Sequence, residues 1–110
     1  MTAATDAYQL AFGELTTAKA EVETIVETIR KGNDALRDWK TANIIDPNYH
    51  WPQNEQSRRT QTLHAGEWPT GQAIAQAIHK FHSKKTTLIQ LWSAIPEANR
   101  VGLQPPDKFI

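Results

Sequence analysis

Apolar residues recur every seven positions from Tyr8 to Trp39, and this repeat limits the fold more than any other feature. The first row holds Tyr8, Leu15, Val22, Ile29 and Leu36, and a second row holds Ala11, Ala18, Ile25, Gly32 and Trp39. Two rows sustained over about five heptads are typical of a helix packed lengthwise against another helix. The repeat predicts one long helix over about residues 6–42, continuous across Gly32, with Thr5 or Asp6 as its N-cap.

A second stripe predicts a second long helix over about residues 70–95. Its apolar positions are three or four residues apart: Ile74, Ile78, Phe81, Leu88, Leu91, Trp92 and Ile95. Pro96 stops this helix, because proline lacks the amide proton that a helix interior needs. We expect Lys84 and Lys85 on its polar side, opposite Phe81 and Leu88.

The segment between the helices, residues 43–70, has a different character. A turn signal at Asp46–Asn48 is followed by two Trp-Pro pairs around a polar middle. Pro52–Ala65 is predicted as a possible short third helix. Residues 96–110 are predicted as an irregular tail, whose Val101, Leu103 and Phe109 pack back against the helices.

The charges of the two predicted helices are complementary. Residues 1–44 carry seven acidic and five basic side chains, whereas residues 71–110 carry two acidic and five basic ones. Opposite net charges favour pairing, although each exposed pair contributes only about 0–1 kcal/mol. The sequence therefore predicts an antiparallel helical hairpin.

Composition excludes several classes of function. The chain has no cysteine, so disulfides, thiolate zinc sites and cysteine nucleophiles are excluded. Twelve basic and twelve acidic residues cancel, so no overall field attracts nucleic acid or an anionic membrane. No stretch is long and apolar enough to span a membrane, and the first six residues lack the layout of a signal peptide. We expect a cytoplasmic protein.

Recognisable catalytic motifs are missing from the sequence. Ser57, Ser83 and Ser93 stand outside any nucleophile motif, and no glycine-rich phosphate loop occurs. Glu21, Glu23 and Glu27 are interpreted as a solvated acidic face, because the second helix has no acidic residue to complete a magnesium site. We expect neither catalysis nor a cofactor.

Histidines provide the one spacing that could bind a metal. His79 and His82 lie three residues apart on the second helix, which places two imidazoles on one face. No pattern recruits a third ligand from His50 or His64, and neighbouring lysines oppose a cation. A solvated polar face is the preferred interpretation, and no metal is expected.

A basic cluster on the second helix supports an alternative function. Lys80, Lys84 and Lys85, with Arg58 and Arg59 as possible additions, could contact phosphate in a small nucleic-acid-binding or regulatory protein. The neutral total charge and the lack of a helix-turn-helix motif argue against this alternative.

The leading interpretation is a single all-α domain over residues 1–110 that acts as a helical scaffold or protein–protein interaction module. Two helices cover only part of each other's stripes, so a four-helix bundle formed by a homodimer is expected. The small residues Ala11, Ala18 and Gly32 favour contact between the first helices of two copies. The predicted interaction residues are Leu15, Val22, Ile25, Ile29, Leu36 and Trp39.

Overall fold

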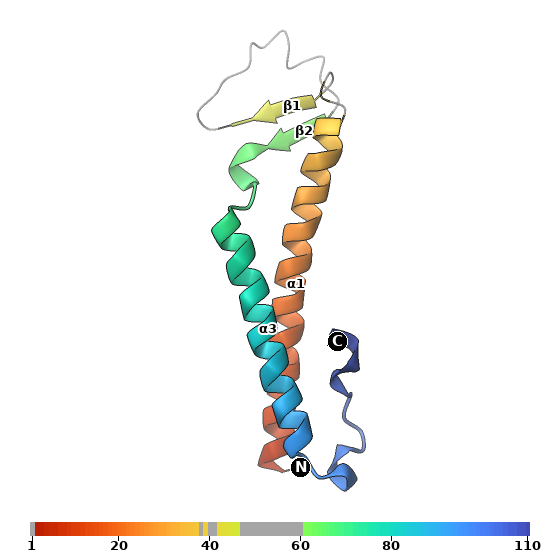
Figure 1. The fold of residues 1–110 in the computed structure, drawn as a ribbon. Helices are drawn as coiled ribbons and strands as arrows, with labels where there is room; N and C mark the ends of the chain where they lie inside the picture. Colours follow the sequence, from red (N-terminus) through yellow and green to blue (C-terminus); the bar gives the residue numbers. More distant parts are fainter. Residues whose placement is uncertain (1, 38, 40–41, 47–60) are drawn as a thin grey trace. The chain divides into compact units, whose positions relative to one another are not determined.

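The computed structural model describes residues 2–37, 39, 42–46 and 61–110. Its long elements are helix α1 (Ala3–Arg37) and helix α3 (Gly71–Ala94), and its strands are β1 (Ala42–Ile45) and β2 (Gln61–His64) (Figure 1). Among the described residues there are also three 3₁₀ helices: η1 (Ala65–Glu67), η2 (Glu97–Arg100) and η3 (Pro106–Phe109). The chain divides into two compact units, one containing the residues up to Val22 together with Ile74–Ile110, and the other containing Glu23–Ala73.

Helix α1 is continuous across Gly32, as predicted. Its N-cap is Thr2, so the prediction of Thr5 or Asp6 was wrong. The Thr2 hydroxyl accepts a hydrogen bond from the Thr5 amide at 3.2 Å, and the Thr5 hydroxyl accepts one from the Thr2 amide at 3.0 Å. These two reciprocal hydrogen bonds resemble a capping box, in which threonine takes the position that glutamate usually occupies.

Both predicted ends of α3 are close to the observed ones. The Thr70 hydroxyl accepts a hydrogen bond from the Ala73 amide at 3.0 Å and caps the first turn. The helix ends at Ala94, two residues before Pro96. By contrast, α1 ends at Arg37 and not near residue 42, because residues 42–45 form β1.

The two helices form the predicted antiparallel hairpin within the unit that contains both termini. Glu21 of α1 contacts Lys80 of α3, and Glu14 contacts Lys84. Residue numbers therefore fall along one helix as they rise along the other.

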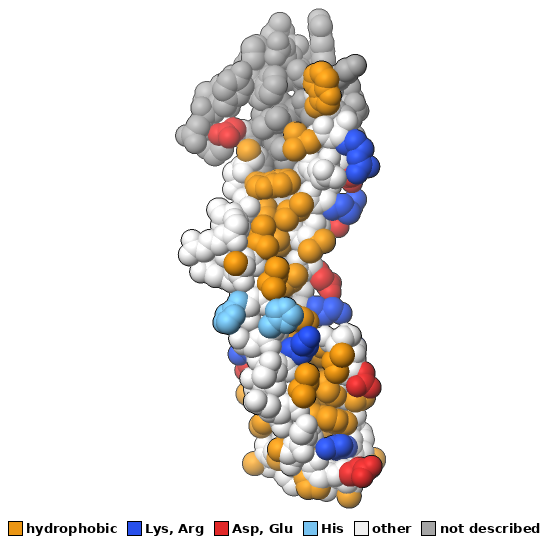
Figure 2. Space-filling model, viewed as in Figure 1, with side chains coloured by type: hydrophobic (Ala, Val, Ile, Leu, Met, Phe, Trp, Pro, Cys, Tyr) orange, Lys and Arg blue, Asp and Glu red, His pale blue; other side chains and the backbone are white. Residues whose placement is uncertain are grey.

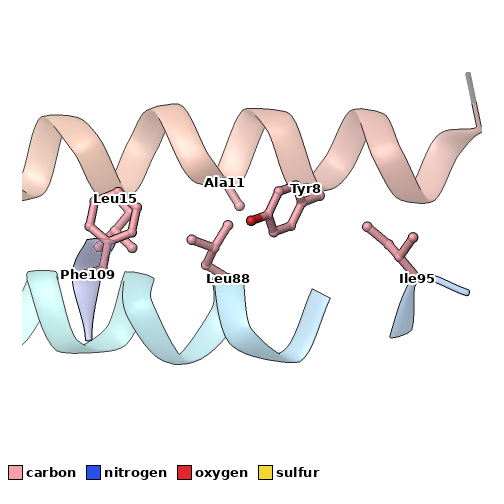
Figure 3. Close-up of a cluster of buried hydrophobic side chains, with 6 residues drawn as sticks. All are labelled: Tyr8, Ala11, Leu15, Leu88, Ile95 and Phe109. Atoms are coloured by element: carbon pink, nitrogen blue, oxygen red, sulfur yellow. The ribbon is translucent and has the colours of Figure 1, made fainter. Parts of the chain in front are cut away.

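The core of this unit lies between the helices and the C-terminal tail (Figure 3). Leu15 of α1 and Leu88 of α3 are each 0% exposed. The buried residues of this core are Tyr8, Ala11, Leu15, Leu88, Ile95 and Phe109. Removing such side chains from water is the main favourable contribution to folding.

The tail is more ordered than the irregular segment predicted. Val101, with φ −60° and ψ 129°, and Gly102, with φ 84°, form a type II turn that the Leu103 amide closes on the Arg100 carbonyl at 3.0 Å. Leu103 and Phe109 pack back as expected, but Val101 is exposed at the turn. The tail thus supplies a third layer over α1.

A two-stranded sheet in the other unit is the exception to the all-α prediction. Strands β1 and β2 pair in parallel, with Ile44 opposite Leu63 and Asn43 opposite Thr62. The predicted third helix was wrong for residues 61–64, where Thr62 and Leu63 suit a strand and pair with a β-branched segment. The rest of that predicted helix, from Pro52 to residue 60, lies outside the described residues.

Candidate interaction surfaces

The predicted interaction stripe of α1 divides into buried and exposed parts. Leu15 is fully buried in the hairpin core and cannot meet another chain. Val22, Ile25 and Ile29 are half-buried, whereas Leu36 is 43% exposed and Trp39 is 68% exposed. The six predicted residues therefore do not act as one surface.

Helix geometry explains why Leu36 leaves the buried face, whereas Trp39 lies beyond the end of α1 at Arg37. A straight α-helix drifts by about 20° per heptad relative to a strict seven-residue repeat. From Tyr8 to Leu36 the accumulated rotation is roughly 80°. Near the end of α1, Gly32 of the second heptad row is still buried, and so is Ala35, which belongs to neither row. Leu36, which continues the first row, is exposed.

Val26 extends the exposed apolar region of α1, because 58% of it is accessible to water. We call Ile25, Val26, Ile29, Leu36 and Trp39 the distal stripe. Figure 2 shows hydrophobic side chains at the surface, with basic and acidic groups beside them. The small row expected to bring two α1 helices together is unavailable, because Ala18 and Gly32 are already buried within the chain.

The charged groups beside the distal stripe form a local network on α1. The Arg30 guanidinium bonds to the Glu27 carboxylate and lies 3.0 Å from an Asp34 oxygen. The hydrogen bond from Arg30 lowers the pKa of Glu27 from its ordinary value. Arg37 lies 3.9 Å from the other Asp34 oxygen, so two arginines balance the two carboxylates on the exposed side of the helix.

Two of the three predicted phosphate-binding lysines form ion pairs within the hairpin. Lys80 Nζ lies 3.2 Å from Glu21 Oε1, and Lys84 Nζ lies 2.8 Å from Glu14 Oε2. Lys85 Nζ lies 5.8 Å from the centroid of the Phe81 ring. Ion pairs between the two helices therefore account for Lys80 and Lys84 without a bound phosphate.

Lys84 and Lys85 were expected on the polar side of α3, opposite Phe81 and Leu88, and this expectation was wrong. Positions 81, 84 and 88 are separated by three and four residues, so they share one side of the helix. Lys84 lies beside the hairpin interface that buries Leu88, and Lys85 is partly covered near Phe81. The lysine stems pack at the edge of the core while their ammonium groups reach charged or aromatic partners.

His79 and His82 are both exposed on α3. The His82 ring packs edge-on against Phe81, with the centroids 5.5 Å apart. Within the part of the chain that the structure describes, no three His, Asp or Glu residues gather in a way that could hold a metal ion.

A third group of candidates lies where the tail crosses α1. Tyr8 donates a hydrogen bond to the Gln104 carbonyl, and burial followed by the nearby Asp107 carboxylate raises the pKa of its phenol above the ordinary 10.0. A pocket of about 200 Å³ opens beside Tyr8, Phe12 and Leu103, and a second of about 220 Å³ lies beside Thr5 and Leu103. The sequence indicated that Phe109 packs back but gave no signal for the partner of Tyr8.

Comparisons with protein-family models, curated proteins and solved structures found no match for this chain. No helix among residues 2–37 and 61–110 is both long and apolar enough to cross a membrane.

Proposed function

We propose that this chain is a non-catalytic helical interaction protein that forms a homodimer through the distal stripe of α1. The observation that carries the proposal is the exposure of Val26, Leu36 and Trp39, which are 58%, 43% and 68% accessible. Single exposed apolar residues are ordinary, but several large ones along one segment are typical of an association surface.

Burial of this stripe would supply the free energy of association. Each Å² of apolar surface removed from water contributes about 25 cal/mol. A second copy offers the same stripe, so a two-fold arrangement would cover both stripes at once. A rigid helix also loses little conformational freedom on binding, which lowers the cost of association.

Charge supports a second copy as the partner. The chain has twelve basic and twelve acidic residues, so two copies do not repel each other through net charge. The carboxylates of Glu27 and Asp34 are balanced beside the stripe by Arg30 and Arg37. Two copies can therefore approach without bringing unpaired like charges together at this place.

Sedimentation equilibrium over a tenfold range of micromolar concentration tests the proposal. The native chain should have a dimer mass, and the Val26→Lys, Leu36→Lys double variant should have a monomer mass, because lysine ammonium groups resist burial. Leu10→Lys is the matched control, since Leu10 is also exposed on α1 but lies outside the distal stripe.

A monomer mass for the native chain at every concentration would refute the dimer. Equal masses for the native chain and the double variant would show that association, if present, uses another surface. Dissociation by Leu10→Lys as well would show that any added lysine on α1 is sufficient and that the stripe is not specific.

A further inference from the structure

The charges beside the distal stripe are unevenly distributed along α1. From Glu23 to residue 29 the helix carries two acidic and no basic side chains, whereas from Arg30 to Arg37 it carries three basic and one acidic. The ion pairs of this segment join neighbouring turns, so they reduce the difference between its two halves but do not reverse it. The first half is therefore negative and the second half is positive.

The C-terminal tail limits where another helix can lie along α1. Phe12 precedes Val26 by 14 positions, or two heptads, so the two residues lie on one side of the helix to within about 40°. The Phe109 ring meets the Phe12 ring edge-on with 5.3 Å between centroids, and Lys108 Nζ lies 4.7 Å from the Phe12 centroid. This side of α1 is thus occupied by the tail at Phe12, whereas Val26 is 58% exposed.

Both features disfavour a dimer in which the two α1 helices run parallel. A parallel two-fold pair places each residue of α1 opposite the same residue of the second copy. Packed helices lie about 8–10 Å apart, which leaves no room between them for the two tails at Phe12. The negative half of one helix would also face the negative half of the other, and like charges oppose association.

We propose that two copies pair through the distal stripe with their α1 helices antiparallel and the two-fold axis near Arg30, where the sign of the charge changes. This inference rests on the proposed dimer and specifies which part of the second copy covers the stripe. Residues 23–29 of each copy then lie opposite residues 30–37 of the other, so opposite charges meet on both sides of the axis. Each α1 ends opposite Glu23 of the other copy, before it reaches the tail at Phe12.

This direction of pairing gives the dimer two equivalent ends. The N-termini of the two α1 helices point away from each other, because the helices run in opposite directions. Each end of the dimer therefore carries the Tyr8 end of one copy. Such a dimer is a two-ended scaffold, whereas a parallel dimer would carry both Tyr8 ends on the same side.

Distances between spin labels on the two copies measure the direction of pairing. The chain has no cysteine, so a single introduced cysteine carries the only label of each copy. Thr17→Cys, Thr24→Cys and Lys31→Cys place labels at exposed positions seven residues apart on α1, outside the distal stripe. Three positions are used because two positions on opposite sides of the axis could give equal distances in an antiparallel dimer.

The antiparallel dimer should give distances that differ among the three variants. Along the helix axis, two like labels separate by about 3 Å for each residue between the label and the two-fold axis, because each copy contributes a rise of about 1.5 Å per residue. Pulsed electron spin resonance should therefore give the shortest distance for Lys31→Cys and the longest for Thr17→Cys. In a parallel dimer the three distances would be equal.

The control adds Val26→Lys and Leu36→Lys to the Thr24→Cys variant. Coupling between the labels should disappear, because the stripe that joins the copies is disrupted. Three equal distances with a dimer mass would overturn the antiparallel direction and leave the proposed dimer in place. A monomer mass for the native chain, without coupling at any position, would overturn both. Coupling that persists in the control would overturn the inference by showing that the copies associate through another surface.

Discussion

Lys84 of α3 and Glu14 of α1 form an ion pair across the hairpin, with 2.8 Å between Nζ and Oε2. A second pair, Lys80 with Glu21, lies farther along the same two helices. Both pairs match acidic residues of the first helix with basic residues of the second, so the charge difference seen in the sequence has a structural counterpart. Parallel helices would place these residues far apart, and the pairs therefore favour the antiparallel arrangement.

Charge reversal tests this relationship. Glu14→Lys should destabilise the fold by up to about 1 kcal/mol, because it places two ammonium groups together, and Lys84→Glu should do the same with two carboxylates. The double reversal should recover most of the loss. Urea unfolding measures the coupling, which should shrink at about 1 M salt. Additive losses in the double variant would show that the pair has no energetic coupling.

Leu88→Ala should cost about 2–5 kcal/mol of unfolding free energy, because Leu88 is fully buried and its truncation leaves a cavity. Ile78→Ala on the same helix should cost less, since Ile78 is exposed. The difference between the two urea midpoints is the measurement. Equal losses would contradict the observed face of α3.

Tyr8 should make stability depend on alkaline pH. Burial raises the pKa of its phenol above the ordinary 10.0, and Asp107 adds to this effect. The folded chain keeps the proton that the unfolded chain releases, so this contribution is complete below about pH 10 and is lost as the pH rises toward the folded pKa.

Tyr8→Phe removes the titrating group and the hydrogen bond to the Gln104 carbonyl. Its unfolding free energy should fall less steeply than that of the native chain above about pH 10. Asp107→Asn should give an intermediate slope, because it removes only the lesser cause of the shift. Identical slopes in all three proteins would exclude Tyr8 as their source.

Thr2→Ala should destabilise α1 by about 0.5–2 kcal/mol, because it removes the hydroxyl that caps the Thr5 amide. Thr16→Ala is the control: its hydroxyl bonds to the Phe12 carbonyl within the helix and is exposed. Thermal unfolding followed by circular dichroism distinguishes them. A larger effect at Thr16 would contradict the cap.

The helices were predictable because their signals are local. The seven-residue rows revealed α1, and Pro96 marked the end of α3. The heptad rule also placed Leu36 and Trp39 on the buried face, where neither lies. It ignores the slow rotation of a straight helix, which moves Leu36, and it continues past Arg37, where α1 ends before Trp39. Agreement is therefore good near Leu15 and poor after about four heptads.

The parallel sheet was not predictable in the same way. Ile44 and Leu63 lie opposite each other in the sheet although 19 positions separate them in the sequence. Neither segment contains a local pattern that determines the register of the strands. The prediction for Lys84 was wrong for a different reason. Its charge suggested the polar side of α3, although its spacing from Phe81 and Leu88 places it at the edge of the helix interface. Charge alone cannot distinguish a solvated lysine from one that reaches past the core to a carboxylate.

The hydrogen bond between Tyr8 and Gln104 joins residues that are 96 positions apart in the sequence. This long separation affects the order in which the chain folds. Closing so long a loop slows folding compared with a hairpin whose contacts are local. During synthesis at about 5–20 residues per second, roughly 5–20 s pass between the addition of Leu15 and the addition of Phe109. Until then α1 exposes apolar surface that Phe109 covers in the folded chain, so the nascent chain is most vulnerable to aggregation before Phe109 emerges.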